Sequence, residues 1–380
     1  MKSIIFGGKI ITGRGSLAEC GKLAGTRVMI VTGSKSVIAS GALDRLKRAL
    51  GKDRAVEVYM GVTKNPTTKE IEQGTLAMRA FAPDTVIAIG GGSPMDAAKV
   101  MVMMYENPDL TFEEAAKGNI PAKRNTMLIA IPTTSGTASE VTRAAVVTYE
   151  DKNIKIGLKS EAFIPDVAIL DAETTVTMPK NVVAETGMDA LTHAVEAYCN
   201  HNLDRFTAPL AEAAICGILG NIVISYETGS LDAREIMHEC QAMAGLAFTN
   251  VGLGMSHGIA HAVGGKFDLG HGLINAIVLP YALRYNAKDE DVAEKLDRFE
   301  EELGMPLADV VDELNSVFGI PTGLREAGIA EDDYLEGWDA FINACLSGST
   351  KSNPRAIDFD TMSRMMEAIY DGIPFEEEEE

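Results

Sequence analysis

The chain lacks the features of a secreted protein and of one that binds nucleic acid. Its five cysteines are scattered, with no Cys-x-x-Cys pair. This pattern disfavours a disulfide framework or a thiolate zinc site and indicates a reduced, cytoplasmic compartment. Basic residues number 34 against 55 acidic ones, giving a formal net charge of -21. Nucleic acids and anionic membranes are therefore not expected partners, because both require a basic surface.

Targeting signals and generic nucleotide motifs are also missing. The N-terminus has no apolar core followed by a small-residue cleavage site, and no uncharged apolar run approaches the length of a membrane span. The chain contains neither Gly-x-Gly-x-x-Gly at the expected turn nor a Walker loop. At 380 residues with 46% hydrophobic side chains, it is long enough for two domains with sizeable cores.

The first half contains short β-branched runs that alternate with helix-like segments. Such runs predict a mainly parallel, Rossmann-like sheet covered by helices on both faces. The expected strands are residues 27–32, 55–59, 85–89, 127–131 and 166–170. Ligands of parallel sheets bind at the carboxyl ends of the strands, so the residues just after these runs are candidates for a binding site.

Three consecutive glycines follow the expected strand at 85–89. Gly90, Gly91 and Gly92 precede a helix that carries Pro94 in its first turn. Glycines allow close backbone approach, and a helix N-terminus offers unpaired N–H groups, so the segment predicts a pyrophosphate site. The alternative is that the glycines serve only a tight strand-to-helix turn.

Hydroxyl side chains follow the expected strand at 127–131. Thr133, Thr134, Ser135 and Thr137 are suited to hydrogen bonds with phosphate, ribose or carboxamide groups. They are equally suited to capping a helix that begins near Ala138. The two roles are compatible.

Four of the six histidines lie in two short segments, residues 185–198 and 255–272. Asp189 and His193 are four residues apart, as are His257 and His261, so each pair shares a helix face; His271 follows. One carboxylate and two or three imidazoles suit a divalent zinc or iron ion. The alternative for each is a hydrogen-bonded core histidine, and spacing does not decide between His257 and His261 as the ligand.

Four motifs together resemble the iron-containing (group III) alcohol dehydrogenase family. They are residues 90–96, 132–142, 187–198 and 255–272, and the match extends to about Tyr285. The resemblance implies a dehydroquinate synthase-like architecture: a dinucleotide-binding α/β domain at 1–179 and an all-helical metal-binding and substrate domain at 180–380. Cofactor and metal would meet in the cleft between them. The acidic tail, 375–380, is expected to be disordered.

The resemblance also implies different roles for the histidines. It implies that Fe²⁺ or Zn²⁺ is held by Asp189, His193, His257 and His271. It leaves His261 unligated beside the nicotinamide, where it relays the alcohol proton or orients the nicotinamide or substrate.

The cofactor contacts implied by the family motifs follow the two loops. The glycine loop lies along the pyrophosphate, the threonines lie near adenine and ribose, and two further residues lie near the nicotinamide ribose. In this chain the positions are Gly90, Gly91, Gly92, Ser93, Thr133, Thr134, Thr137, Asp96 and Lys155.

The end of the first strand departs from NAD-preferring relatives. Gly33 stands where they often carry an aspartate that binds the adenosine 2′-hydroxyl and repels a 2′-phosphate. Lys35, Ser34 and Ser36 are suited instead to a 2′-phosphate. Both NAD and NADP remain candidates, and we predict turnover with NADPH.

The predicted function is that of a metal-dependent, NAD(P)-linked alcohol dehydrogenase or aldehyde reductase. It would transfer a hydride between nicotinamide C4 and a small primary alcohol, diol or its aldehyde, with the metal as Lewis acid, in a homodimer. Alternatives are a glycerol-dehydrogenase-like or dehydroquinate-synthase-like enzyme, or a non-catalytic nucleotide and metal sensor. His201 and His238 are expected to be structural or on the surface, and residues 248–250 and 253 to line either substrate pocket or core.

Overall fold

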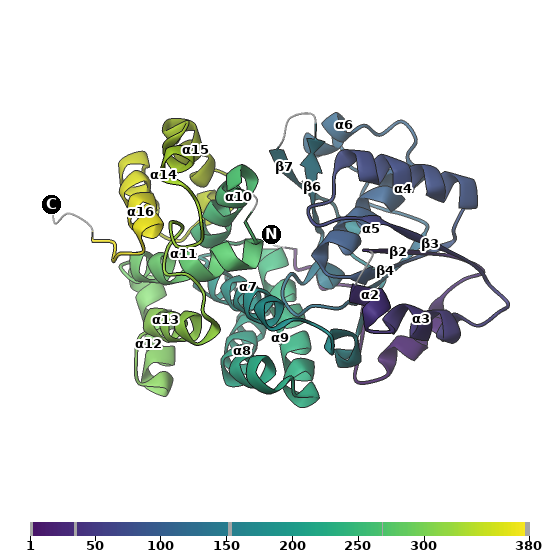
Figure 1. Ribbon diagram of the computed structural model, residues 1–380, viewed down its shortest axis with the longest axis horizontal. Coiled ribbons are helices and arrows are strands. Elements are labelled where there is room, and N and C mark those ends of the chain that lie inside the picture. Colours follow the sequence, from purple (N-terminus) through teal and green to yellow (C-terminus); the bar gives the residue numbers. More distant parts are fainter. Residues whose placement is uncertain (1–2, 34–35, 151–153, 268, 377–380) are drawn as a thin grey trace.

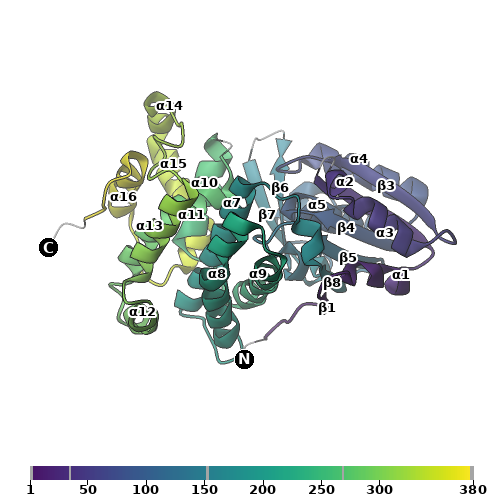
Figure 2. The same ribbon diagram turned by 60° about the horizontal axis from the view of Figure 1, so that its bottom comes forward.

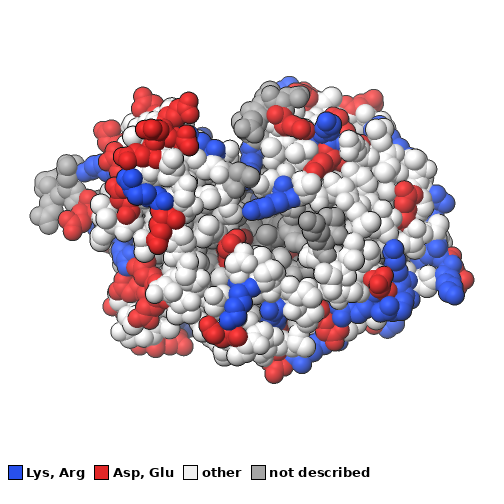
Figure 3. Space-filling model, viewed as in Figure 1, with Lys and Arg blue, Asp and Glu red and all other residues white. Residues whose placement is uncertain are grey.

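The chain folds into an α/β part and a helical part that lie side by side (Figure 1). The structure, a computed structural model, describes residues 3–33, 36–150, 154–267 and 269–376. A hollow separates the two parts on one face, and acidic side chains gather over the helical part (Figure 3).

A six-stranded parallel sheet forms the centre of the α/β part. Its order is β1-β8-β5-β4-β2-β3. The strands are β1 (Lys9–Thr12), β2 (Arg27–Gly33), β3 (Ala55–Val62), β4 (Thr85–Gly90), β5 (Met127–Pro132) and β8 (Val167–Leu170). Gly90 pairs with Pro132 and Ile89 with Thr32, so β2, β4 and β5 end at one edge. The three segments predicted to bind the cofactor therefore leave the sheet side by side.

Helices cover both faces of the sheet, as predicted. Alternate residues of β2 and β4 point to opposite cores, with Met29 and Val86 on one face and Ile30 and Ile87 on the other. The helices are α1 (Cys20–Leu23), α2 (Ser36–Ala39), α3 (Ala42–Leu50), α4 (Thr68–Phe81), α5 (Gly92–Glu106) and α6 (Phe112–Ala116). Figure 1 shows α4 and α5 on the opposite side of the sheet from α3.

Two features of this part differ from the expectation. β1 joins the sheet beside β8 although its short sequence carries no strong strand pattern. A helix near Ala138 is wrong: Ala138 has a left-handed φ of 53°, a short 3-10 turn covers Ser139–Val141, and an antiparallel hairpin follows. Its strands are β6 (Ala144–Tyr149) and β7 (Ile154–Lys159). Hydrogen bonds of Ser139 Oγ with Asp96 and Lys99 hold this turn.

The helical part begins at α7, directly after Pro179. Its helices are α7 (Lys180–Cys199), α8 (Ala208–Thr228), α9 (Leu231–Val251), α10 (Met255–Phe267), α11 (His271–Asn286), α12 (Glu290–Leu303), α13 (Leu307–Phe318), α14 (Glu331–Leu335), α15 (Trp338–Cys345) and α16 (Phe359–Asp371). The predicted α/β plus all-α fold is confirmed. The long helical patterns at 208–225 and 233–248 correspond to α8 and α9.

Helix α8 is more apolar than its neighbours. Within the described residues it alone is long and apolar enough to cross a membrane, with a mean hydropathy of 1.6. Glu212 and Glu227 bound its uncharged stretch, which is shorter than a membrane span. Its inner side packs along α7 and α9.

The start of the chain crosses to the helical part. The backbone N–H of Ile5 donates to Asn250 Oδ1 at 2.7 Å, and Asn250 Nδ2 donates to the Ile5 carbonyl at 2.8 Å. Asn250, a candidate for the substrate pocket, therefore fastens the N-terminal segment to α9.

Candidate active site and metal centre

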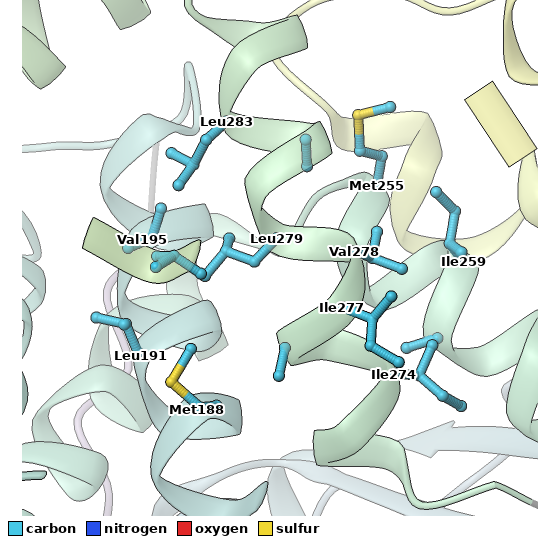
Figure 4. Packing of buried hydrophobic residues seen from close by; sticks show 14 of the residues in the cluster. Met188, Leu191, Val195, Met255, Ile259, Ile274, Ile277, Val278, Leu279 and Leu283 are labelled. Carbon is cyan, nitrogen blue, oxygen red and sulfur yellow. The ribbon is translucent and has the colours of Figure 1, made fainter. Parts of the chain in front are cut away.

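Three helices carry the predicted metal ligands. Asp189 and His193 lie on α7, His257 and His261 on α10, and His271 is the first residue of α11. Figure 4 shows apolar side chains joining these helices, among them Met188 and Leu191 of α7, Ile259 of α10, and Ile274 and Leu279 of α11. Burial of each such side chain contributes about 1.5–3 kcal/mol, so the ligands stand on a rigid base.

Three of the four predicted ligands come together. Asp189 Oδ1 lies 3.8 Å from His257 Nε2 and 3.7 Å from His271 Nε2, and one ligand atom from each residue lies within 4.8 Å of the others. These separations suit one ion at metal–ligand distances of about 2.1 Å. The spacing of His257 and His261 did not show which of them is a ligand. In the structure His257 lies in one group with Asp189 and His271.

His193 lies beside this group. Its Nδ1 is 3.9 Å from Asp189 Oδ2 and is buried without a hydrogen-bond partner. The ring stacks on Phe248, with centroids 4.5 Å apart. Phe248, a candidate for pocket wall or core, thus helps to hold a predicted ligand.

Asn275 lies at the centre of the ligand group, which consists of Asp189, His257 and His271. Its Nδ2 is 2.8 Å from Asp189 Oδ1 and 3.2 Å from both His257 Nε2 and His271 Nε2, while its Oδ1 is buried without a partner. A carboxylate and two imidazole nitrogens thus converge on one donor. Such a convergent acceptor set fits a divalent iron or zinc ion.

Glu196 fixes the orientation of His257. Its Oε2 accepts a hydrogen bond of 2.7 Å from His257 Nδ1, so Nε2 presents its lone pair to the ligand group. The same carboxylate accepts bonds from the backbone N–H groups of Gly254, at 2.9 Å, and Ser256, at 2.6 Å. Glu196 therefore holds both the ring and the N-terminus of α10.

The site favours neutral imidazoles and an ionised carboxylate. Burial lowers the pKa of His257 well below 6.5, and neighbouring His193 and His271 add to the effect. Burial acts to raise the pKa of Asp189, but the adjacent histidines outweigh it and the pKa falls below 3.8. These are the protonation states in which both groups bind a metal ion.

The side chain of His261 is exposed to solvent. Its ring stacks on that of His271, with centroids 5.0 Å apart and planes 15° apart. Desolvation by the protein atoms around the ring lowers the pKa of His261 well below 6.5, and nearby His271, His257 and Lys155 lower it further. His261 thus combines a contact with a predicted ligand and access to water, as a group that exchanges protons with solvent requires.

The predicted cofactor loops face each other at the edge of the sheet. Gly90 has a φ of +151°, which suits glycine. A methyl group on Gly91 would lie 3.5 Å from Thr134 Oγ1, and one on Gly92 would lie 3.0 Å from Thr137 Cγ2. Gly91 and Gly92 start the helix α5, so its N–H groups lie between the loops. This arrangement suits a bound pyrophosphate.

The remaining predicted cofactor residues border these loops. Ser93 is in the first turn of α5, and Thr133 is buried where β5 ends. Gly33 ends β2 and Ser36 begins α2, while Ser34 and Lys35 lie outside the described residues. Lys155 extends from β7 toward α10, where its Nζ would lie 3.5 Å from a methyl group on Gly264.

Asp96, a predicted cofactor residue, makes hydrogen bonds within the protein. Its Oδ1 accepts a hydrogen bond of 2.6 Å from Ser139 Oγ, and its Oδ2 accepts one of 2.9 Å from the backbone N–H of Val146. The buried Lys99 Nζ donates to Ser139 Oγ at 2.8 Å and to the Ala144 carbonyl at 2.8 Å. The carboxylate therefore connects the loop after Thr137 to the hairpin.

The two parts also meet through buried polar groups behind the loops. Ser135 Oγ lies 2.8 Å from His238 Nδ1 on α9, and Gln241 accepts from the Ala138 N–H at 2.8 Å and bonds Glu140. His238 is structural, as expected. His201 is on the surface, 3.3 Å from Asp289 Oδ1.

Sequence reasoning missed Glu196, Asn275 and Lys99. A weak signal existed for the first two, because Glu196 is seven residues after Asp189 and Asn275 four residues after His271, so each shares a helix face with a predicted ligand. Their polarity alone did not distinguish them from solvated side chains.

Known proteins are similar to this chain over most of its length. A profile of iron-containing alcohol dehydrogenases matches residues 7–172, and a profile of the C-terminal part of the Fe-containing alcohol dehydrogenase family matches residues 183–370. An NADPH-dependent butanol dehydrogenase of Clostridium saccharobutylicum is 40% identical over 376 residues, covering 96% of each chain. A 1-propanol dehydrogenase of Citrobacter freundii is 33% identical, covering 97% of this chain and 100% of its own.

Solved structures of known proteins have the same fold. An iron-containing alcohol dehydrogenase from Thermococcus thioreducens superposes with a TM-score of 0.90 at 30% identity, covering 97% of this chain and 100% of its own. Together with the ligand group between α7, α10 and α11 and the glycine loop at the sheet edge, these likenesses show that the chain belongs to the iron-containing alcohol dehydrogenase family.

Proposed function

We propose that this enzyme interconverts small primary alcohols or diols and their aldehydes, with NADPH as an accepted hydride donor. The convergence of Asp189, His257 and His271 on one point, beside a glycine loop suited to pyrophosphate, carries the proposal. The similar butanol and propanol dehydrogenases support the substrate class, and the NADPH dependence of the former supports the cofactor.

Asp189, His193, His257 and His271 would hold the metal. A bound Fe²⁺ or Zn²⁺ ion would supply Lewis acidity to the substrate oxygen. Glu196 keeps His257 in the ligating orientation, and Phe248 packs against His193. His261, exposed and stacked on His271, would take the alcohol proton and pass it to water.

The loops would orient the cofactor. The backbone N–H groups at Gly91 and Gly92 and the hydroxyls of Thr134 and Thr137 would bind the pyrophosphate and adenosine side. Lys155 would approach the nicotinamide ribose from β7. Gly33 supports NADP use, since it offers no carboxylate to repel a 2′-phosphate.

We also propose a domain boundary at residues 179/180, where α7 begins, a cytoplasmic location and assembly as a homodimer. The five unpaired cysteines support a reduced compartment. Exposed apolar side chains on one face of α8 support self-association.

A single assay tests the reaction. The absorbance of NADPH or NADH at about 340 nm is followed with small aldehydes, before and after chelation, and with Fe²⁺ or Zn²⁺ restored. We expect metal-dependent oxidation of NADPH. An efficiency with NADPH more than about a hundredfold below that with NADH, roughly 2.7 kcal/mol, contradicts the cofactor proposal. Cofactor binding without turnover under every condition favours a sensor instead.

A further inference from the structure

Helix α5 begins with the glycine loop and carries two charged residues one and two turns later. Asp96 and Lys99 lie four and seven residues after Gly92, so their side chains share one face of the helix. Lys99 is only 2% exposed. A buried ammonium group lowers stability unless it is paired and hydrogen-bonded, so its partners indicate what it contributes.

The partners of Lys99 all belong to one short segment. Its Nζ donates to Ser139 Oγ at 2.8 Å, to the Thr142 carbonyl at 3.1 Å and to the Ala144 carbonyl at 2.8 Å. These oxygens can take up all three N–H groups of the ammonium. Lys99 therefore holds the backbone from the turn at Ser139 to the start of β6 against α5.

Ser139 connects the ammonium to Asp96 and to the threonine loop. Its Oγ accepts from Lys99 and donates to Asp96 Oδ1 at 2.6 Å, and its backbone N–H donates to Thr137 Oγ1 at 3.4 Å. A methyl group on Gly92 would in turn lie 3.0 Å from Thr137 Cγ2. The contacts thus form a closed path that leaves α5 at its charged face and returns to its first turn. This path fixes the width of the gap between the glycine loop and Thr137.

The same two charged residues also hold the β6–β7 hairpin. Asp96 Oδ2 accepts from the Val146 N–H at 2.9 Å, and Lys99 binds the Ala144 carbonyl. Figure 2 shows this hairpin between α5 and the helical part. Its second strand carries Lys155, which is predicted to lie near the nicotinamide ribose. Both ends of the predicted cofactor contact are therefore held by α5.

The charge of Lys99 is retained at neutral pH. Burial lowers its pKa to about 8, while Asp96 and Glu140 act to raise it. At pH 7 the ammonium is therefore protonated and donates all of its hydrogen bonds. Glu140 accepts a hydrogen bond from Gln241 of α9, so the network continues into the helical part.

We propose that Lys99 is a positioning residue for the cofactor: together with Asp96, it fixes both the gap between the glycine loop and Thr137 and the hairpin that carries Lys155. The proposal rests on the dinucleotide binding proposed above, and it does not depend on which of NAD and NADP is preferred.

Ser139→Ala opens the path with the smallest change, because it removes the hydroxyl that joins Lys99, Asp96 and the threonine loop. In the metal-loaded chain we expect the Kd for NADPH, measured by nicotinamide fluorescence, to rise about tenfold. The KM for NADPH should rise with it, while kcat at saturating cofactor changes less than about threefold and metal content is unchanged. Ser225→Ala is the matched control, since Ser225 is an equally buried hydroxyl on α8 and should leave the Kd unchanged.

Lys99→Gln is the second variant. Its side chain is neutral and shorter and has only two N–H groups, so we expect a larger rise in the Kd than in Ser139→Ala. Circular dichroism and urea unfolding verify that each variant is folded. If Ser139→Ala and folded Lys99→Gln bind NADPH as tightly as the native chain and only unfold at lower urea, Lys99 stabilises the fold without positioning the cofactor. A native chain that binds neither NADPH nor NADH contradicts the proposed function as well.

Discussion

The two parts of the molecule build their binding groups in opposite ways. The α/β part offers backbone N–H groups and hydroxyls at strand ends, with Gly90, Gly91 and Gly92 where we propose that the cofactor approaches. The helical part offers ionisable side chains buried among packed helices, such as Asp189 and His257. The first site therefore depends on leaving space, and the second on supplying charge at fixed positions.

The largest effect should come from removing charge at the ligand group. Asp189→Asn keeps the shape of the side chain but removes the carboxylate that lies near both His257 and His271. We expect loss of bound metal and a fall in kcat/KM of roughly 10³-fold or more, measured by metal analysis and steady-state rates. Asp297→Asn, at an exposed position of α12, is the control. Normal metal content and turnover in Asp189→Asn would show that the ligand assignment is wrong.

The next prediction tests whether the orientation of a metal ligand matters as much as the charge of one. Glu196→Gln cannot accept the three hydrogen bonds that hold His257 and α10. We expect metal affinity to fall about 10–100-fold, measured by chelator competition and by the visible spectrum of the cobalt-substituted protein. Glu140→Gln makes the same change at a buried carboxylate that contacts Gln241 instead of a ligand, and should keep its metal. Equal metal affinities in the two variants would show that Glu196 does not support the metal site.

A smaller change should separate the cofactor site from the metal site. Gly91→Ala adds a methyl group in ordinary contact with Thr134, so the chain still folds, but the group occupies the space between the loops. We expect the KM for the cofactor to rise about tenfold, roughly 1.4 kcal/mol, with metal content unchanged. Gly220→Ala, where a methyl group meets no atom within 4 Å, is the control. An unchanged KM would place the pyrophosphate elsewhere.

The smallest effect concerns the contact between the parts. Burial lowers the pKa of His238 to about 4 from an ordinary 6.5, so the neutral ring that bonds Ser135 is favoured by folding. The stability this provides is complete above pH 6.5 and is lost as the pH falls toward 4, by at most about 1.4 kcal/mol per pH unit. His238→Gln, which does not titrate, should show a slope up to about one proton shallower in urea unfolding across that window. Identical slopes would contradict a buried neutral His238.

Local patterns predicted the strands, the glycine loop and the paired ligands because each depends on neighbours in the chain. The apolar run at 85–89 followed by glycines is recognisable by itself, and the four-residue spacing of Asp189 and His193 follows from helix geometry. The helix expected near Ala138 was wrong because the conformation of this residue depends on a partner far along the chain: Gln241 accepts a hydrogen bond from the Ala138 N–H. The hydrogen bonds of Asp96 with Ser139 and Val146 could not be predicted for the same reason.

The sequence alone determined the α/β and helical parts, the residue types of both sites and, through resemblance, the family. Spacing alone left His257 and His261 undecided, and the family resemblance named His257 as the ligand. Only the tertiary structure showed that His257 lies with Asp189 and His271, that Glu196 orients it, and that Asn275 lies at their centre. The physical reason is that hydrogen-bond partners and ligand groups form between helices separated by many residues, so their geometry is set by how the apolar faces of α7, α10 and α11 pack.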